Sequence, residues 1–484
     1  MKLLKVYISA FCMCSLSVLL NSCDDFLKEE PLDMKSSDQF WKTKADAESG
    51  VNALYFGGVP YLHNTDVGGG WTPKATMWGG IVSGLYVDKR KDRTFTTASE
   101  GCNFNIESFD DIAMKYWHEF YKGISRANFV IANIPSMTGV LDEATINNYV
   151  AQGKFFRAYG YFWLVKEFGG VPYISEPYTS TEGMYKERLS AEEIYKKIEA
   201  DLLDIVNGDA LPNKTFYENG CYVTRAMAQT LLAQVYLQWA GAPLNGGADY
   251  YSKAAQMALK VINDSPHGLI HPNGTTDDLN SAYNVIKTTK ESAEIIYAKE
   301  YNYTNYSVGN SYACRSIGAD AFQWGVFHPG GDVLYNAYLP CDMLLNSYDP
   351  ADIRGHEKQF FFWEYTDAAG GTHTLNNAGN WAWFDENALI SGHDGDYNMP
   401  VFRFAEVLLI AAEGLARTGH EDNAVGGAKY YLNQVRKRAG LMDETATGDN
   451  LVQAILTERL HELPLEFKIW DDIRRTRLYP EAST

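Results

Sequence analysis

Small residues recur at helical spacing in the stretch 403–419, and that spacing limits how its helix can pack. The apolar side chains of this stretch fall on one helical face, while Glu406 and Glu413 fall elsewhere. Residues as small as Ala412 and Ala416 let the backbone of a neighbouring helix come close. We therefore expect a helix packed tightly against others, with Glu413 on its outer side.

Two segments fit the spacing of tetratricopeptide repeats, in which small residues mark the contact between paired helices. In residues 224–266, Ala233 takes the small position of the first helix, and Ala254 and Ala258 take those of the second, across a long loop. Residues 403–435 fit the same pattern with a shorter insertion. The predicted fold class is mostly α, with tetratricopeptide-like helical hairpins joined by long irregular loops rich in aromatic residues.

Start and stop signals frame two further helices. Ser190 and Glu193 form a capping box at the start of a helix that should end near Asn207. A strongly aromatic helix over residues 147–168 should stop at the glycine pair that begins with Gly169. The apolar stripes of these helices are predicted to be core and not ligand sites.

Two regions, about residues 55–105 and 297–398, have little helical pattern and are rich in Gly, Asn and aromatic residues. Irregular segments this long in a compact protein are more often functional loops than spacers. An aromatic ring can cover the C–H face of a sugar, while amides and carboxylates bind its hydroxyl groups. The alternative is that each Trp only packs its loop onto the helices. The predicted platform residues are Trp71, Trp78, Tyr303, Trp324, Trp363 and Trp381, with Asn103 and Arg315 as polar candidates.

The start of the chain has the layout of a secretory signal. Two lysines precede an apolar stretch over residues 6–20, which is short for a membrane span, and Cys23 follows Leu-Asn-Ser. This arrangement is typical of a bacterial lipoprotein that is cleaved before Cys23 and acylated on it; an ordinary signal peptide or an uncleaved anchor is the alternative. We predict a signal peptide over residues 1–22 and a single lipid-anchored domain over residues 23–484.

Charge and cysteine content exclude several partners. A formal net charge of -19 argues against nucleic acid as a partner. Beyond the signal peptide and Cys23, no pair of cysteines has the C-x-x-C spacing of a zinc or thioredoxin-like site. The pairing of the remaining cysteines is left open: Cys102, Cys221, Cys314 and Cys341.

Four stretches in order after the signal resemble one family. They are "QGKFFRAYGYFWLVKEFGGVPYI", "VTRAMAQTLLAQVYLQWA", "RFAEVLLIAAEGLARTG" with "LNQVRKRAGL", and "LTERLHELPLEFKIWDDIRR". Together they are similar to SusD/RagB outer-membrane proteins over most of the chain from Cys23. The resemblance implies a surface lipoprotein that binds a nutrient, usually a glycan, and delivers it to a SusC-like TonB-dependent transporter. The acidic run after Cys23 likewise resembles a lipoprotein surface-export tag.

The chain departs from the family pattern at two places. Phe467 stands where the family usually has Gly, and Ile469 where it usually has Arg, in a motif that we interpret as structural, a helix whose carboxylates and arginines brace one another. The family also usually continues beyond the equivalent of Thr484. The resemblance therefore leads us to expect a chain that is C-terminally short.

The sequence contains no complete motif of the common enzyme classes that we considered. His118 and His461 each begin a zinc-protease-like motif that lacks its second His, and there is no nucleophile elbow or P-loop. Asp394, Asp396 and Asn398 have calcium-loop spacing without the required Gly and Glu. We predict a non-catalytic protein without cofactor or metal that binds its glycan weakly, at roughly micromolar affinity or poorer. A peptide-binding member of the same family, a helical glycoside hydrolase and an adhesive repeat protein remain alternatives.

Overall fold

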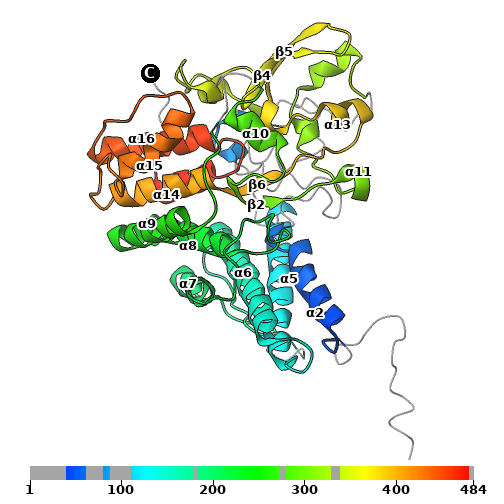
Figure 1. The fold of residues 1–484 in the computed structure, drawn as a ribbon, viewed down its shortest axis with the longest axis vertical. Coiled ribbons are helices and arrows are strands. Elements are labelled where there is room, and N and C mark those ends of the chain that lie inside the picture. The colour runs from blue at the N-terminus through cyan, green and yellow to red at the C-terminus, as the bar shows by residue number, and fades with distance from the viewer. Residues whose placement is uncertain are drawn as a thin grey trace, which may run out of the picture.

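Helices dominate the structure, as the sequence predicts (Figure 1). The computed structural model describes residues 40–60, 80–87, 111–178, 180, 183–271, 279–328 and 338–478. Over these ranges no helix combines the length and the apolarity that a membrane crossing requires.

Successive antiparallel helices build one half of the molecule, and each packs against the one before it (Figure 1). In the chain, these helices come after the short helix α2 (Lys44–Asn52). The helices are α5 (Asp111–Asn133), α6 (Glu143–Phe168), α7 (Ala191–Asn207), α8 (Arg225–Ala240) and α9 (Gly247–Asp264). The array continues with C-terminal helices, because α9 packs against α14 (Phe404–Ala416), which contacts α15 (Ala428–Arg438) and α16 (Gly448–Glu462). The predicted hairpins α8–α9 and α14–α15 are both confirmed.

The ends of these helices lie where the sequence signals place them. Ser190 and Glu193 form the capping box of α7, which ends at Asn207. Thr224 caps α8 through its side chain. Gly169 closes α6 with a φ of 67°, a conformation that glycine adopts without steric cost.

The contact between α14 and α9 explains the small residues of the stretch 403–419. A Cβ atom on Gly414 would lie 2.5 Å from the carbonyl oxygen of Tyr251 and 2.9 Å from Cβ of Ala255, so the two helices touch through their backbones. The prediction that Glu413 lies on the outer side is wrong, because its side chain is fully buried. Its carboxylate accepts hydrogen bonds from Arg475, which supplies the charge that burial would otherwise leave unpaired.

Short elements make up the other half, where the sequence analysis expects irregular loops. In the described residues they include three two-stranded antiparallel sheets. The strand pairs are β1 (Tyr86–Val87) with β3 (Leu339–Pro340), β2 (Ile295–Lys299) with β6 (Met399–Arg403), and β4 (Phe361–Thr366) with β5 (Thr372–Asn380). The short helices are α10 (Ala282–Thr288), α11 (Tyr303–Tyr306), α12 (Asp342–Leu345) and α13 (Glu386–Ser391). The β4–β5 hairpin was not predicted, although its aromatic run followed by a Gly-rich turn favours one.

A buried network of ion pairs joins the two halves. Arg403 bonds Glu294 and Glu462, each at 2.8 Å, and Arg438 bonds the same two carboxylates, each at 2.5 Å. Arg354 adds a third cation 3.1 Å from Glu462. Carboxylates and arginines therefore brace the C-terminal motif, as predicted. The motif is not one helix, however, because a turn separates α16 from α17 (Ile469–Thr476), and the ion pairs connect several elements.

Candidate functional site

The structure describes only some of the predicted site residues. Cys23, Trp71, Trp78 and Asn103 lie outside the described residues, so their roles stay predictions. Of the others, Arg315 is buried, whereas four aromatic residues are partly accessible: Tyr303, Trp324, Trp363 and Trp381.

Tyr303 forms a stacked pair with His393, with ring centroids 4.3 Å apart and planes inclined by 16°. Tyr303 begins the short helix α11, whose preceding residue Asn302 caps it by accepting the N–H of Asn305 at 3.0 Å. Both stacked rings are partly accessible, and Tyr306 at the end of the same turn is 76% exposed. The pair therefore presents aromatic surface to solvent.

Hydrogen bonds from a neighbouring loop fix the position of Tyr303. The Asp396 carboxylate accepts the backbone N–H of Tyr303 at 2.5 Å and the hydroxyl of Thr304 at 2.6 Å. Gly309 lies so close to Asp394 and Tyr303 that a Cβ atom would clash with both. Asp396, one of the residues with calcium-loop spacing, therefore holds α11 in place.

Trp324 lies in a second stack with residues of the β4–β5 hairpin. Its ring is 4.7 Å from that of His373, at 18°, and 6.0 Å from that of Tyr365, at 4°. Asp367 orients His373 through a 2.8 Å contact with Nε2. Trp324 and His373 are both partly accessible, so this stack also reaches the surface.

His328 and Gly392 connect the two stacks. The chain runs from Trp324 to His328, whose backbone N–H bonds the carbonyl of Leu389 on α13 at 3.0 Å. The ring of His328 occupies the space where a side chain on Gly392 would stand, and the residue after Gly392 is His393. We call this set of residues the aromatic strip: Trp324, His373, His328, His393 and Tyr303. Figure 1 shows α11 and α13, which carry one end of it, on the same side of the molecule.

Two charged groups, Arg315 and Asp394, interact near His393 of the strip. Arg315 is buried, and its guanidinium bonds the carbonyl of Ser311 at 2.6 Å. Burial raises the pKa of Asp394, an effect that the charges of Arg315 and His393 partly offset. Arg315 therefore lies buried within electrostatic reach of Asp394 and is not displayed on the surface as the sequence analysis expects.

The remaining predicted rings, Trp363 and Trp381, are partly accessible and also have packing partners. Trp363 lies on β4 and packs against the core cluster that contains Tyr348 and Phe361. Trp381 donates its indole N–H to Asn284 at 2.7 Å, and the Lys287 amine lies 4.0 Å from the centre of its ring. Their proposed contact with a ligand stays a prediction, but much of their surface already has protein partners.

The sequence analysis missed the three histidines of the strip. His328, His373 and His393 follow no motif, and each meets its partner from a separate segment of the chain. The single usable signal was their position inside the region predicted to hold functional loops.

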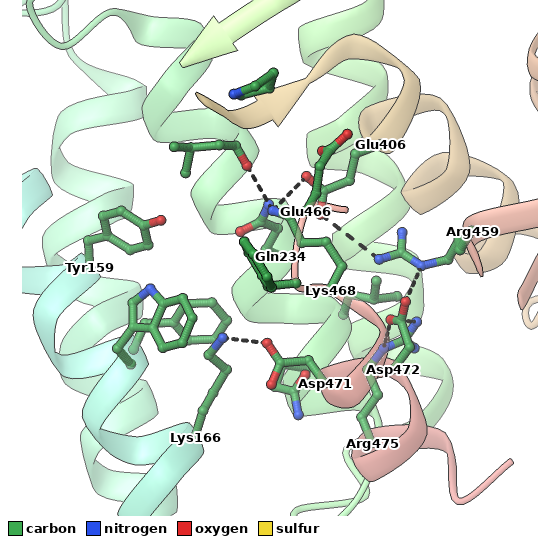
Figure 2. A pocket seen from close by; sticks show the side chains of 17 residues that line it. Tyr159, Lys166, Gln234, Glu406, Arg459, Glu466, Lys468, Asp471, Asp472 and Arg475 are labelled. Carbon is green, nitrogen blue, oxygen red and sulfur yellow. Dashed lines mark hydrogen bonds and ion pairs between the residues drawn. The ribbon is translucent and has the colours of Figure 1, made fainter. Parts of the chain in front are cut away.

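A cavity of about 60 Å³ lies between α6, α8 and the C-terminal segment (Figure 2). Figure 2 shows acids and bases paired around it: Lys166 with Asp471 at 2.6 Å, Arg459 with Asp472 at 2.8 Å, and Lys468 with Glu406 at 3.1 Å. Because its charges already neutralise one another, this cavity is better explained as the braced junction of the two halves than as a ligand site.

Comparisons with known proteins agree with this fold. The model of the SusD family matches residues 357–483, and a model described as "Starch-binding associating with outer membrane" matches residues 81–237. The SusD-like protein P2 of Formosa agariphila is 26% identical, covering 96% of this chain and 90% of that protein. A SusD superfamily protein of Parabacteroides distasonis has a TM-score of 0.79 at 25% identity, covering 91% of this chain and 90% of that one. Surface glycan-binding protein A of Bacteroides thetaiotaomicron, solved in complex with laminarihexaose, has a TM-score of 0.70 at 22% identity, covering 89% of this chain and 90% of that one.

Proposed function

This chain belongs to the SusD family, and from that premise we propose that it is a surface lipoprotein that captures a glycan and passes it to a SusC-like TonB-dependent transporter. The capture step rests on the aromatic strip, and the handover and the lipid anchor rest on the family and on the signal over residues 1–22 with Cys23. The chemistry is binding alone, with no bond made or broken.

The observation that carries the capture step is the pair of partly accessible ring stacks, which the segment from Trp324 to His328 and its contact with Gly392 link. Tyr303 with His393, and Trp324 with His373, offer partly exposed ring faces with fixed orientations. Sugar rings present C–H faces that pack on such rings, while their hydroxyl groups bond the polar edges of imidazoles. A neighbour of this fold is solved with laminarihexaose, which supports an oligosaccharide as the ligand class.

The shape of the site predicts weak binding. A partly exposed strip removes less water from a ligand than a closed pocket does, so little hydrophobic free energy is gained. We expect dissociation constants in the micromolar range or weaker, about -8 kcal/mol or less in magnitude. Weak capture suits a protein that must release its ligand to a transporter.

The test is calorimetric titration of the mature protein with laminarihexaose, malto-oligosaccharides and xylogluco-oligosaccharides, with product analysis of the same samples. Binding of one class without shortened chains is the expected result. Cleaved oligosaccharides would replace the proposal by a hydrolase. Failure of every glycan to bind, together with binding of a peptide mixture, would identify a peptide-capturing relative instead.

Lipid anchoring has its own test. Replacement of Cys23 by Ala should release the protein from the membrane fraction of the producing bacterium, because the anchor supplies the acyl chains that hold it there. A matched Cys221→Ala variant should stay in the membrane fraction, since Cys221 is a free thiol in the folded domain. Membrane retention of the Cys23 variant would contradict the lipoprotein assignment.

A further inference from the structure

Three carboxylates are bonded to the elements that form the stack of Trp324 on His373, namely those of Asp320, Asp367 and Glu386. Asp320 lies in the same short 3-10 helix as Trp324 (Ala319–Trp324) and accepts a backbone N–H of strand β5 at 3.1 Å. Asp367 is 2.8 Å from Nε2 of His373. Glu386, on α13, accepts the hydroxyl of Tyr365 at 2.6 Å, and the Tyr365 ring lies parallel to that of Trp324. Acidic side chains therefore reach this stack from three separate segments.

No strong base cancels the negative charge of these three acids. Among the described residues, no lysine or arginine forms an ion pair with any of them, and His373 is their one basic partner. Their other partners are neutral donors, such as the backbone N–H groups of Ala369 and Gly371, which bond Asp367 at 2.9 Å each. The bond with His373, followed by those from the backbone, lowers the pKa of Asp367 below its ordinary value. A neutral donor stabilises the carboxylate without supplying a positive charge.

At the opposite end of the strip, the acids have cations within electrostatic reach. Burial raises the pKa of Asp394, and the charge of Arg315 partly offsets that effect. The charge of Lys290 has the smallest of the effects that lower the pKa of Asp396 against its burial. The excess of negative charge is therefore greatest at the end of the strip that carries Trp324.

A different predicted ring has positive neighbours. The amine of Lys287 lies 4.0 Å from the centre of the Trp381 ring, and that of Lys358 lies 5.8 Å from it. Trp381 does not belong to the strip. The surroundings of the two rings thus differ in sign, negative at Trp324 and positive at Trp381.

We propose that the strip takes neutral glycans and rejects glycans whose units carry carboxylate or sulfate groups. The inference rests on the proposed function, because it names the class of glycan for the same residues. A sugar packed on the Trp324 ring has its substituents at its edge, within the field of the three acids. Hydroxyl groups can donate to these carboxylates, whereas a carboxylate or sulfate on the ligand only accepts and adds a like charge. Asp320, Asp367 and Glu386 are therefore specificity-determining residues that act by repulsion.

The test is calorimetric titration of the mature protein with pairs of hexasaccharides that share a backbone. The pairs are laminarihexaose and its sulfate ester, maltohexaose and its sulfate ester, and cellohexaose and the corresponding hexaglucuronate. At about 10 mM ionic strength, where charges act over about 30 Å, the charged member of the pair that binds should be at least about tenfold weaker. At about 1 M salt, where this range is about 3 Å, the two members should differ much less. Because salt does not alter the size of a ligand, this change separates charge from steric exclusion.

A double variant locates the effect. Asp320→Asn with Glu386→Gln removes two charges and keeps the hydrogen-bond acceptors. The affinity of the charged member relative to the neutral one should therefore rise about threefold or more at low salt. The matched control, Asp209→Asn with Glu192→Gln, removes two exposed charges from the helical half and should leave this ratio nearly unchanged.

Each other result has its own meaning. Equal affinities within a pair at low salt, an unchanged ratio in the double variant, or an equal change in the control would overturn this inference and leave glycan capture intact. Tighter binding of the charged member would also overturn it, and would favour Trp381 with its two lysines as the ligand site. Failure of every hexasaccharide to bind would contradict glycan capture itself, and the inference with it.

Discussion

Arg475 and Glu413 form a fully buried ion pair with two parallel hydrogen bonds. Both N–O distances are 2.6 Å, and the partners lie on α17 and α14, 62 residues apart in the chain. Arg475 also bonds Asp472, and Arg417 adds a contact with Glu413 at 3.2 Å. Burial alone would raise the pKa of Glu413, but the charge of Arg475, with help from Arg417, lowers it to about 2.

Replacement of Arg475 by Met should destabilise the protein by about 3–5 kcal/mol, because Glu413 would remain buried without its main partner. The measurement is the free energy of unfolding in urea. Arg225→Met is the matched control, since Asp209, the partner of Arg225, is fully exposed and such surface pairs contribute about 1 kcal/mol or less. Equal losses of unfolding free energy in the two variants would show that the buried pair stabilises the protein no more than the surface pair does.

His461 should make stability depend on pH. Its Nε2 is 3.0 Å from the hydroxyl of Ser347, and burial, followed by the charges of Arg354 and Arg436, lowers its pKa from 6.5 to about 3. Between pH 6.5 and pH 3, His461 therefore binds a proton in the unfolded chain but stays neutral in the folded protein. This contribution to stability is complete above pH 6.5 and is lost as the pH falls toward 3, by up to about 1.4 kcal/mol per pH unit.

The His461→Gln variant isolates this effect. Between pH 4 and 6 the difference in unfolding free energy between wild type and variant should change with a slope of about one proton, since the other titrating groups cancel in the difference. Urea unfolding at several pH values measures it. Parallel curves for the two proteins would mean that His461 keeps an ordinary pKa.

Gly414→Ala tests the close approach of α14 and α9. Alanine favours a helix over glycine by up to about 1 kcal/mol, but its Cβ would lie 2.5 Å from the Tyr251 carbonyl oxygen. We expect a net loss of about 1–3 kcal/mol, because two backbones must move apart. Gly139→Ala, where the added atom meets nothing within 4 Å, should change the unfolding free energy little. A stabilised Gly414→Ala protein would argue against direct backbone contact.

Tyr303→Ala should weaken glycan binding about tenfold, or about 1.4 kcal/mol, because it removes one face of the stack with His393. Titration with whichever oligosaccharide binds the wild type provides the measurement. Tyr185→Ala serves as the control, since Tyr185 is fully exposed on the loop before α7 and does not belong to the aromatic strip. Loss of binding in the control alone would move the ligand site to that loop.

The sequence predicted the parts of this fold that are encoded locally. The caps at Ser190 and Thr224 and the hairpin α8–α9 each depend on residues close together in the chain, so spacing alone identifies them. The strip could not be found in this way, because Tyr303 and His393 are 90 residues apart and meet only after separate loops fold together.

The structure explains how Phe467 is accommodated at a position where the family usually has Gly. It has a φ of 59°, in the left-handed region, where the family resemblance leads one to expect Gly. Its ring lies 5.7 Å from that of Tyr312 and 5.8 Å from that of Trp383, so its packing compensates for the backbone conformation. The spacing of the motif could not reveal this, because those two rings come from distant segments.

The ion network around Glu294 and Glu462 sets an order of events during folding. Arg438 meets Glu294 across 144 residues, whereas the α8–α9 hairpin closes within a few turns of chain. Closing a long loop has a higher entropic cost than forming neighbouring helices, so the hairpins should form first and the network last. Pulsed hydrogen exchange during refolding should protect the amides of α8 and α9 before those of β2 and β6, and simultaneous protection would contradict this order.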